Sequence, residues 1–334
     1  MGISLYEHVN ISDISPFVQE VLDGIEFARG SPTSKWGSIR ASMGHPKPFD
    51  LRYVAVGNEE CERDLKAIYL EYYPKFYDAI KQVYPDIQII SNCDAAKLPI
   101  NHPADLYDYH RYPQSANEIF HMAQDFDHAS RTGPKAFVSE YALTGEEAGY
   151  GTLLAAVAEA AFLIGLEKNS DVVSMVSYAP LFVNTNDRRW NPDAIVYDSH
   201  QVYGTPSYWV LKLFKESSGA TLLNSILQSN SSTLAASAIS WKSSIDGKSI
   251  LRIKVANLKS NTVNVDIFID GLEFENSKLT KTILTSANIM DENSFSQLNK
   301  VVPKESPFEN AGKIMNVQID PHSVTLFDIP YVYQ

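Results

Sequence analysis

The spacing of apolar residues divides the chain into two stretches. From about residue 50 to 215, short β-branched or aromatic runs alternate with longer amphipathic segments, a pattern that indicates consecutive βαβ units around a parallel sheet. After about residue 217, Ser, Asn and Thr separate short segments in which apolar and polar residues alternate, as in antiparallel strands. We therefore expect an α/β domain over residues 1–216 and a β-sandwich over residues 217–334.

In the α/β stretch, five apolar runs suit strands that are buried on both faces. A helix over 14–29 should precede them, with Ser12 or Asp13 as its N-cap and Gly30 as its stop. The aromatic residues in 64–83 recur at a spacing of three and four, which indicates a helix packed on the sheet more than a surface for sugar stacking. The expected strands are 52–57, 87–91, 106–110, 136–140 and 172–178, and the expected helices between and after them are 64–83, 115–132, 151–168 and 207–216.

In the second stretch, period-two alternation predicts antiparallel strands. Asp246-Gly247 separates the first two of them and is a hairpin signal, because glycine adopts the backbone conformation that tight turns need. The expected strands are 235–241, 249–257, 263–269, 278–285 and 323–329.

Composition narrows the possible functions. The 334 residues are 44% hydrophobic and 20% charged, as in an ordinary globular protein with two domains. The net charge of −12, without a Lys/Arg cluster, disfavours nucleic acid and anionic membranes as partners but suits a neutral sugar. Neither a membrane span nor an export signal is expected within this chain, which has no long apolar run and no basic start.

The two cysteines, Cys61 and Cys93, are too few for a disulfide framework or a four-ligand zinc site. The cellular compartment therefore stays open on cysteine usage alone.

Glu59 and Glu140 each stand at the C-terminal end of an expected parallel strand, the first and the fourth. Barrels and open α/β sheets carry their chemistry at that end. Three βα units separate the two residues, so their carboxylates can face each other across one rim.

Glycoside hydrolysis needs two such carboxylates, one to protonate the leaving oxygen and one to attack the anomeric carbon or activate water. A separation near ~5 Å would mean retention of configuration. Asn58 could hydrogen-bond the adjacent sugar hydroxyl. Each glutamate alone could be an ordinary charge at a polar strand end, but the pair, its order and the preceding Gly57-Asn58 favour catalysis. Glu60 is a rival acid, although the next residue along a strand points to the opposite face.

Four segments resemble the α-L-arabinofuranosidases of glycoside hydrolase family 51, most closely the plant branch: residues 53–59, 110–112, 137–141 and 190–208. The resemblance implies a (β/α)₈ barrel followed by a β-sandwich. It also implies retaining hydrolysis without a cofactor or metal, and release of terminal non-reducing arabinofuranose from arabinan and arabinoxylan.

By the same resemblance, Glu59 is the acid/base, Glu140 the nucleophile and Asn58 a sugar ligand. Tyr112 resembles the family tyrosine that touches the nucleophile and the sugar. His110 is either another ligand or a hydrogen-bonded structural residue of its strand.

Two further candidates for sugar contacts, Trp190 and Asn191, follow the fifth expected strand, in a loop where the family lines its pocket. His102 and His200 are too scattered to form a metal site with His110.

The chain departs from the family in one respect. Family members carry three additional βα units, and usually a carbohydrate-binding-like domain, ahead of the region where this chain begins. The expected barrel is therefore partial, which leaves three hypotheses: an arabinofuranosidase or a fragment of one, an inactive remnant that binds carbohydrate or a partner, and another retaining glycosidase such as a xylanase. Plant members are usually secreted to the cell wall, which implies an extracellular location and gives weight to the sequons at Asn10 and Asn230.

Overall fold

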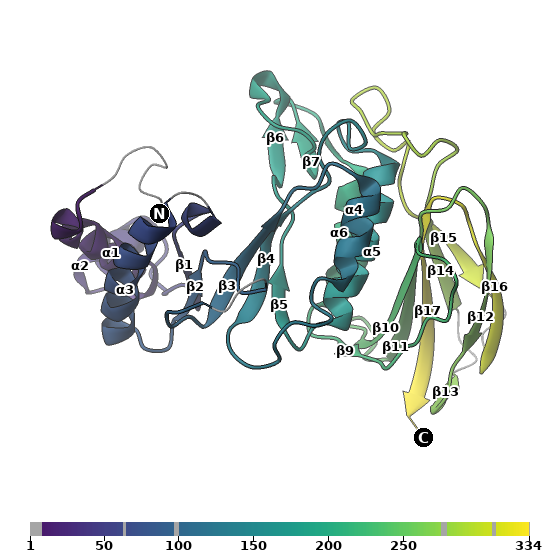
Figure 1. Ribbon diagram of the computed structural model, residues 1–334, viewed down its shortest axis with the longest axis horizontal. Coiled ribbons are helices and arrows are strands. Elements are labelled where there is room, and N and C mark those ends of the chain that lie inside the picture. The colour runs from purple at the N-terminus through teal and green to yellow at the C-terminus, as the bar shows by residue number, and fades with distance from the viewer. Residues whose placement is uncertain (1–8, 63–64, 97–99, 275–278, 309–311, 334) are drawn as a thin grey trace. The chain divides into compact units, whose positions relative to one another are not determined.

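The structure, a computed structural model, describes residues 9–62, 65–96, 100–274, 279–308 and 312–333 (Figure 1). It consists of two compact units. The first comprises the described residues up to 109 together with 130–138, and the second comprises 110–129 and the described residues from 139 onward. The expected domain boundary between residues 216 and 217 falls inside the second unit, where helices give way to antiparallel strands.

The five strands expected in the α/β stretch are present and form one sheet. Their order in the sheet is their order in the chain, β1-β2-β3-β4-β5. β1 pairs with β2 in parallel, and β2 pairs with β3 in parallel. These strands are β1 (Tyr53–Val56), β2 (Gln88–Ser91), β3 (Leu106–Arg111), β4 (Lys135–Tyr141) and β5 (Val173–Val176).

The first unit contains three α-helices among its described residues: α1 (Ser15–Arg29), α2 (Lys35–Ser42) and α3 (Lys66–Val83). The cap expected for α1 is wrong, because Ile14 precedes the helix and Asp13 belongs to a 3-10 turn, although Gly30 follows its last residue as expected. α2 was not expected, since it is short and has no apolar periodicity. Its N-cap is Ser34, whose Oγ accepts a hydrogen bond from the Gly37 backbone.

The aromatic residues of α3 pack into the protein, as their spacing predicts. Tyr69 and Tyr73 are 4% and 0% exposed and share a core with Ile25 of α1 and Ile89 of β2. A cavity of about 190 Å³ remains among α1, β1 and α3.

Arg40 of α2 is the largest fully buried side chain of the described chain, with 1% exposure. Its guanidinium holds the connections around α2 together, because the hydrogen bonds that it donates to described residues all go to backbone carbonyls. These belong to Phe27, Ala28, Gly30, His45 and Pro46.

The second unit contains α4 (Ala116–His121), α5 (Leu153–Lys168) and α6 (Pro206–Phe214). The helix expected over 115–132 is wrong in length. It ends at His121 and continues only as a 3-10 turn, because the sequence beyond is rich in polar and turn-forming residues. α5 is apolar on all sides and almost wholly buried, as expected for a helix covered on every face. Figure 1 shows it between β5 and the antiparallel strands.

The segment after β5 is not a simple loop, as the sequence suggested, but a small sheet. β6 and β7 pair in parallel, and β7 and β8 pair antiparallel. The strands are only three residues each, which is too short for a periodicity to be visible in the sequence. They are β6 (Phe182–Asn184), β7 (Ile195–Tyr197) and β8 (Val202–Gly204).

The C-terminal stretch forms a larger and a smaller antiparallel sheet that share one apolar core, which is the expected sandwich arrangement (Figure 1). Leu251 and Phe327 of the larger sheet and Met315 and Ile319 of the smaller one lie in this core. The larger sheet has the order β15-β14-β17-β11-β10-β9, with β13 beside β17, and the smaller pairs β12 with β16. The strands are β9 (Thr221–Leu222), β10 (Leu234–Lys242), β11 (Ser249–Asn257), β12 (Val263–Phe268), β13 (Leu272–Phe274), β14 (Leu279–Leu284), β15 (Lys304–Phe308), β16 (Ile314–Ile319) and β17 (Ser323–Tyr333).

The five strands expected here correspond to β10, β11, β12, β14 and β17, although residue 278, where one was expected to begin, lies outside the described residues. β9, β13, β15 and β16 were not expected. The hairpin between β10 and β11 is confirmed, with Gly247 at φ +73° in its turn.

Charged groups attach the larger sheet to the helices of the second unit. Nζ of Lys254 on β11 lies 2.5 Å from Oε1 of Glu167 on α5, and the exposures of the two side chains are 0% and 7%. Ser237 of β10 donates to the other oxygen of Glu167. On the same strand as Lys254, Arg252 donates to the Leu213 carbonyl of α6 at 3.1 Å and makes a two-pronged ion pair with Asp328 of the neighbouring strand β17. This packing relies on buried, paired charge as well as on apolar contact.

Candidate active site

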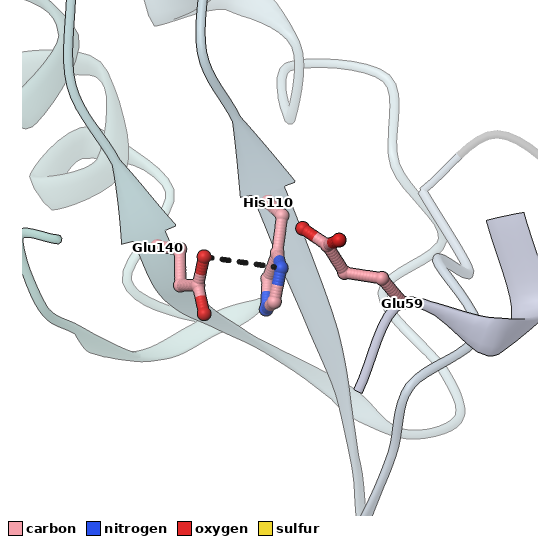
Figure 2. Close-up of side chains that lie close together, drawn as sticks. All are labelled: Glu59, His110 and Glu140. Carbon is pink, nitrogen blue, oxygen red and sulfur yellow. Dashed lines mark ion pairs between the residues drawn. The ribbon is translucent and has the colours of Figure 1, made fainter. Parts of the chain in front are cut away.

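Glu140 lies near the end of β4, and two side chains of the second unit meet its carboxylate. The hydroxyl of Tyr112 donates to Oε2 of Glu140 at 2.7 Å. Nδ1 of His110 lies 3.5 Å from the same oxygen, the ion pair that Figure 2 marks with a dashed line. His110 is largely buried, with 8% side-chain exposure, whereas Glu140 keeps 31%. The carboxylate is thus held in a fixed direction but remains accessible to a ligand.

Backbone hydrogen bonds bring these residues together. The segment after β4 is joined to the last residue of β3 by Ala142 N to Arg111 O at 3.3 Å, and to the segment after β3 by Thr144 N to Pro113 O at 2.8 Å. Tyr112, one residue beyond β3, is therefore placed beside the end of β4. Because His110 and Tyr112 are two residues apart, they point to the same side of an extended chain.

Trp190 joins this group. Its ring lies edge-on to Tyr112, with the two centroids 5.7 Å apart, and 47% of the residue is exposed. Asn191 behaves differently, because its amide donates to the Gly149 carbonyl at 2.8 Å and so fixes the loop between β6 and β7. The structure therefore brings Trp190 toward the candidate site, while the side chain of Asn191 binds backbone.

The same loop contains a buried acid that the sequence did not reveal. Asp193 is 1% exposed, and Nη1 of Arg188 lies 3.3 Å from its Oδ2. Burial raises the pKa of Asp193 to about 6, although the positive charge of Arg188 acts to lower it. The guanidinium also lies 4.9 Å from the centroid of the Tyr150 ring.

Glu159, in the middle of α5, was also missed. It is 1% exposed, and burial raises its pKa to about 7. Oε1 accepts the backbone N–H of Leu143 at 2.9 Å, three residues beyond Glu140. A lone glutamate within the apolar run of 153–166 was the available signal, because a buried acid needs a hydrogen-bond partner.

Glu59, the third side chain drawn in Figure 2, belongs to the first unit. It lies three residues beyond β1, in a left-handed backbone conformation with φ +62°. The preceding Asn58 is exposed.

The prediction that strand alternation directs Glu60 to the opposite face is wrong, because β1 ends at Val56 and Glu60 begins a 3-10 turn, Glu60–Glu62. Glu60 is instead engaged within the first unit. Its Oε2 accepts hydrogen bonds from the backbone N–H of Asn58 and from the side-chain amide of Asn92.

Cys61 and Cys93 form a disulfide, which the sequence had not predicted. Two cysteines separated by 32 residues give no pairing signal of their own. The bond depends on β1 and β2 being neighbours, so that the segments after both strands lie together.

Two family models match the chain. The model of the alpha-L-arabinofuranosidase 1 domain matches residues 1–131, and the model of the alpha-L-arabinofuranosidase C-terminal domain matches residues 129–323. Together they define the class as arabinofuranosidase-like.

Relatives narrow this class. Alpha-L-arabinofuranosidase 1 of Arabidopsis thaliana is 60% identical over 98% of this chain and 48% of its own length. The arabinose-bound structure of the MgGH51 arabinofuranosidase is 30% identical, with a TM-score of 0.87 over 99% of this chain and 54% of that one. An arabinofuranosidase from Thermotoga maritima shares the fold at 19% identity, with a TM-score of 0.76 over 94% of this chain and 73% of that one.

The chain belongs to glycoside hydrolase family 51, the α-L-arabinofuranosidases, and resembles a plant member, as the motifs indicated. The α/β-plus-sandwich arrangement expected from the sequence is confirmed at that level. The chain spans about half the length of the curated relatives it matches.

Proposed function

We propose that this chain carries the catalytic residues of a retaining α-L-arabinofuranosidase, which removes terminal non-reducing arabinofuranosyl residues from arabinan or arabinoxylan. The observation that carries the proposal is the oriented, accessible carboxylate of Glu140 at the end of a strand, in a chain of this family. Charge supports the substrate class, because a net charge of −12 suits a neutral glycan.

Glu140 is the proposed nucleophile. A nucleophile that forms a glycosyl–enzyme bond must approach the anomeric carbon along one direction, and the hydrogen bond from Tyr112 together with His110 restricts the carboxylate to it. Tyr112 therefore has a catalytic role in this proposal. His110 has the supporting one.

Glu59 is the proposed acid/base. Glu59 follows β1, and Glu140 is the next-to-last residue of β4, so each stands at the strand end where such sheets carry their chemistry. Protonation of the leaving oxygen by Glu59, followed by its activation of water, completes a double displacement. The reaction needs no metal or cofactor in this scheme.

The sugar is proposed to lie against the exposed face of Trp190, with Asn58 and Tyr112 as polar contacts. Sugar and cofactor pockets combine aromatic walls with a few placed polar groups, and Trp190 is exposed and adjoins Tyr112. Asn191 contributes by fixing the loop that carries Trp190.

The α/β part is proposed to be the later part of a (β/α)₈ barrel. β1 is the outermost strand of its sheet in the described part of the chain, and the cavity of about 190 Å³ adjoins it. The relatives extend well beyond the matched region, with about half of their length outside it.

An extracellular location is proposed as well. A disulfide between Cys61 and Cys93 persists in oxidising compartments, and the sequon residues Asn10 and Asn230 are exposed. No helix in the described ranges has the length and apolar character needed to cross a bilayer.

The test is hydrolysis of an aryl α-L-arabinofuranoside by the purified chain, with Glu140→Ala as the control. We expect turnover by the unmodified chain and loss of at least about 10³-fold in the variant, because the covalent step requires the nucleophile. Absence of turnover above this control in a folded sample would refute catalysis by this chain alone. A folded, inactive sample that is retained on an arabinoxylan column would point to a binding protein instead.

Azide rescue assigns the two roles. In Glu59→Ala, azide should attack the glycosyl–enzyme intermediate and give a product of retained configuration, whereas in Glu140→Ala it should replace the nucleophile and give the inverted product. The anomeric configuration is read by NMR. The opposite pairing of variants and products would reverse the assignment.

A further inference from the structure

We infer that Glu60, Asn92 and the Cys61–Cys93 disulfide form a clamp that positions the side chain of Glu59, so that Glu60 is a positioning residue for the acid/base step. The inference rests on the proposed role of Glu59. All four members of the clamp lie with Glu59 in the first unit.

The segment 57–61 needs such support because its backbone is strained. Gly57 has φ +88°, which a glycine adopts without strain, whereas Glu59 has φ +62° although it carries a Cβ. A non-glycine residue persists in the left-handed region only where its surroundings enforce that conformation. Without support, the residues on both sides of Glu59 would relax, and its carboxyl would move with them.

Hydrogen bonds hold the segment on both sides of Glu59. Before it, the Asn58 backbone donates to Oε2 of Glu60. After it, the Cys61 backbone donates to Oδ1 of Asn92 at 3.2 Å. The Asn92 amide also donates to Oε2 of Glu60, which joins the two bonds into one network.

The clamp is anchored in the core. Asn92 is 3% exposed, and its backbone N–H donates to the hydroxyl of Tyr69 at 3.0 Å. That hydroxyl in turn donates to the Val56 carbonyl at 2.9 Å, at the end of β1. The strand that precedes Glu59 and the residue that holds its loop are thus connected through one buried tyrosine.

The network leaves no room for a side chain at Gly57. A Cβ there would lie 2.4 Å from Nδ2 of Asn92 and 2.7 Å from Cε2 of Tyr69. Glycine is therefore required at this position both by its φ and by the close approach of the clamp.

The disulfide adds a covalent connection at the same place. It joins Cys61, two residues after Glu59, to Cys93, one residue after Asn92. The clamp therefore combines a hydrogen-bonded part, through Glu60 and Asn92, with a covalent part, the disulfide, which reduction or mutation can remove separately.

These contacts also explain why two acidic residues follow Asn58. Oε2 of Glu60 is used by two donors of its own unit, so Glu60 serves as an acceptor that shapes the loop. Glu59 is left as the residue whose position the loop determines. The sequence Asn-Glu-Glu then contains one chemical and one positioning glutamate.

The first measurement does not depend on activity. Hydrogen–deuterium exchange at the Asn58 amide is compared in the unmodified chain, Glu60→Ala, Glu60→Gln and the control Glu71→Ala, an exposed residue of α3. We expect about tenfold faster exchange in Glu60→Ala, because the Asn58 N–H loses its charged acceptor; a tenfold change corresponds to about 1.4 kcal/mol. Glu60→Gln keeps an acceptor oxygen and should exchange close to the unmodified rate, while core amides of α3 stay protected in all variants.

The second measurement tests the consequence for catalysis. An acid that protonates the leaving oxygen matters most for leaving groups of high pKa, so kcat/KM is compared for an alkyl and a dinitrophenyl arabinofuranoside. Glu60→Ala should lose about 10- to 100-fold on the alkyl substrate, the range expected when a catalytic group is misplaced by about 1 Å. It should lose much less on the dinitrophenyl substrate, and Glu60→Gln should recover most of the loss.

The double variant Cys61→Ser/Cys93→Ser tests the covalent part of the clamp. It should show the same dependence on the leaving group, in smaller degree, because the hydrogen-bonded part remains.

Equal losses on both substrates, or identical exchange at Asn58 in Glu60→Ala and Glu60→Gln, would overturn the positioning role. If the unmodified chain turns over neither substrate, the proposed function fails, and the exchange measurement alone then decides whether the clamp exists.

Discussion

Replacing Glu159 by Gln removes a buried acid that binds the backbone three residues beyond the candidate nucleophile Glu140. Glu159 is 1% exposed in α5, and its Oε1 accepts the Leu143 backbone N–H at 2.9 Å. Burial raises its pKa to about 7, from 4.5 for an ordinary glutamate, while the Leu143 N–H acts in the opposite direction. Gln has almost the same shape and keeps an acceptor for Leu143, so the variant changes the charge with little change in packing.

The magnitude follows from proton linkage. Between pH 4.5 and about 7, the folded chain holds a proton on Glu159 that the unfolded chain has released. The contribution of Glu159 to stability is therefore complete below pH 4.5 and is lost as the pH rises through about 7. The difference between 7 and 4.5 is about 2.5 pKa units, which at about 1.4 kcal/mol per unit gives roughly 3.5 kcal/mol.

The assay is urea unfolding of the unmodified chain and Glu159→Gln at intervals from pH 5 to 8. Other titrating groups act equally on both proteins, so they cancel in the difference between the two free energies of unfolding. We expect this difference to shift by about 2–3 kcal/mol in favour of the variant as the pH rises. Glu146→Gln, at an exposed position six residues beyond Glu140, should show no such shift. Parallel pH profiles for Glu159→Gln and the unmodified chain would refute the reasoning.

Three further predictions concern other parts of the second and first units. Tyr112→Phe removes the hydrogen bond to Glu140 and should lower kcat about 10- to 100-fold in the arabinofuranosidase assay, with a smaller change in KM; an unchanged kcat would exclude a role for the hydroxyl. Lys254→Met leaves Glu167 buried without its cation and should lower the free energy of unfolding in urea by about 3–5 kcal/mol. The double change Lys254→Met/Glu167→Met should cost less than the sum of the two single changes, and additive costs would contradict this coupling. Arg40→Lys cannot supply the several donors that a guanidinium offers to the buried carbonyls, and it should lower the free energy of unfolding by more than about 2 kcal/mol. A loss below about 0.5 kcal/mol, the size of a typical surface substitution, would show that water replaces those hydrogen bonds.

The expected behaviour of Lys254 has a physical origin in its surroundings. Burial lowers the pKa of Lys254, and the attraction of Glu167 only partly offsets this. The cost of removing the lysine charge from water therefore outweighs the attraction of its partner, which is why removal of both charges should cost less than the sum of the two single removals.

The elements that the sequence predicted well are those whose pattern is local and repeated. The five parallel strands are short apolar runs between amphipathic segments, and α3 and α5 have enough turns for their packing to be visible in the spacing of residues. α2 and the three strands of residues 182–204 were missed because three to eight residues are too few to establish a period. The helix predicted over 115–132 is too long because the amphipathic pattern continues beyond the last helical residue, His121.

The candidate site shows the same division. Glu59, Tyr112, Glu140 and Trp190 could be selected from the sequence because each follows a recognisable strand or belongs to a family motif. The hydrogen bond between Tyr112 and Glu140 depends on β3 and β4 being neighbours, which no local pattern specifies. Glu159 was missed because its function in the structure is to bind a backbone amide from another segment.

The sequence by itself determined the class of elements, the family and which residues are candidates for the chemistry, because these depend on residue type and short-range periodicity. The tertiary structure decided which groups meet. It paired Cys61 with Cys93, assigned Glu60 to its own loop and enclosed Lys254 and Glu159 in the core. Such contacts join residues tens of positions apart, and only the folded chain brings them within the few ångströms over which hydrogen bonds and buried charges act.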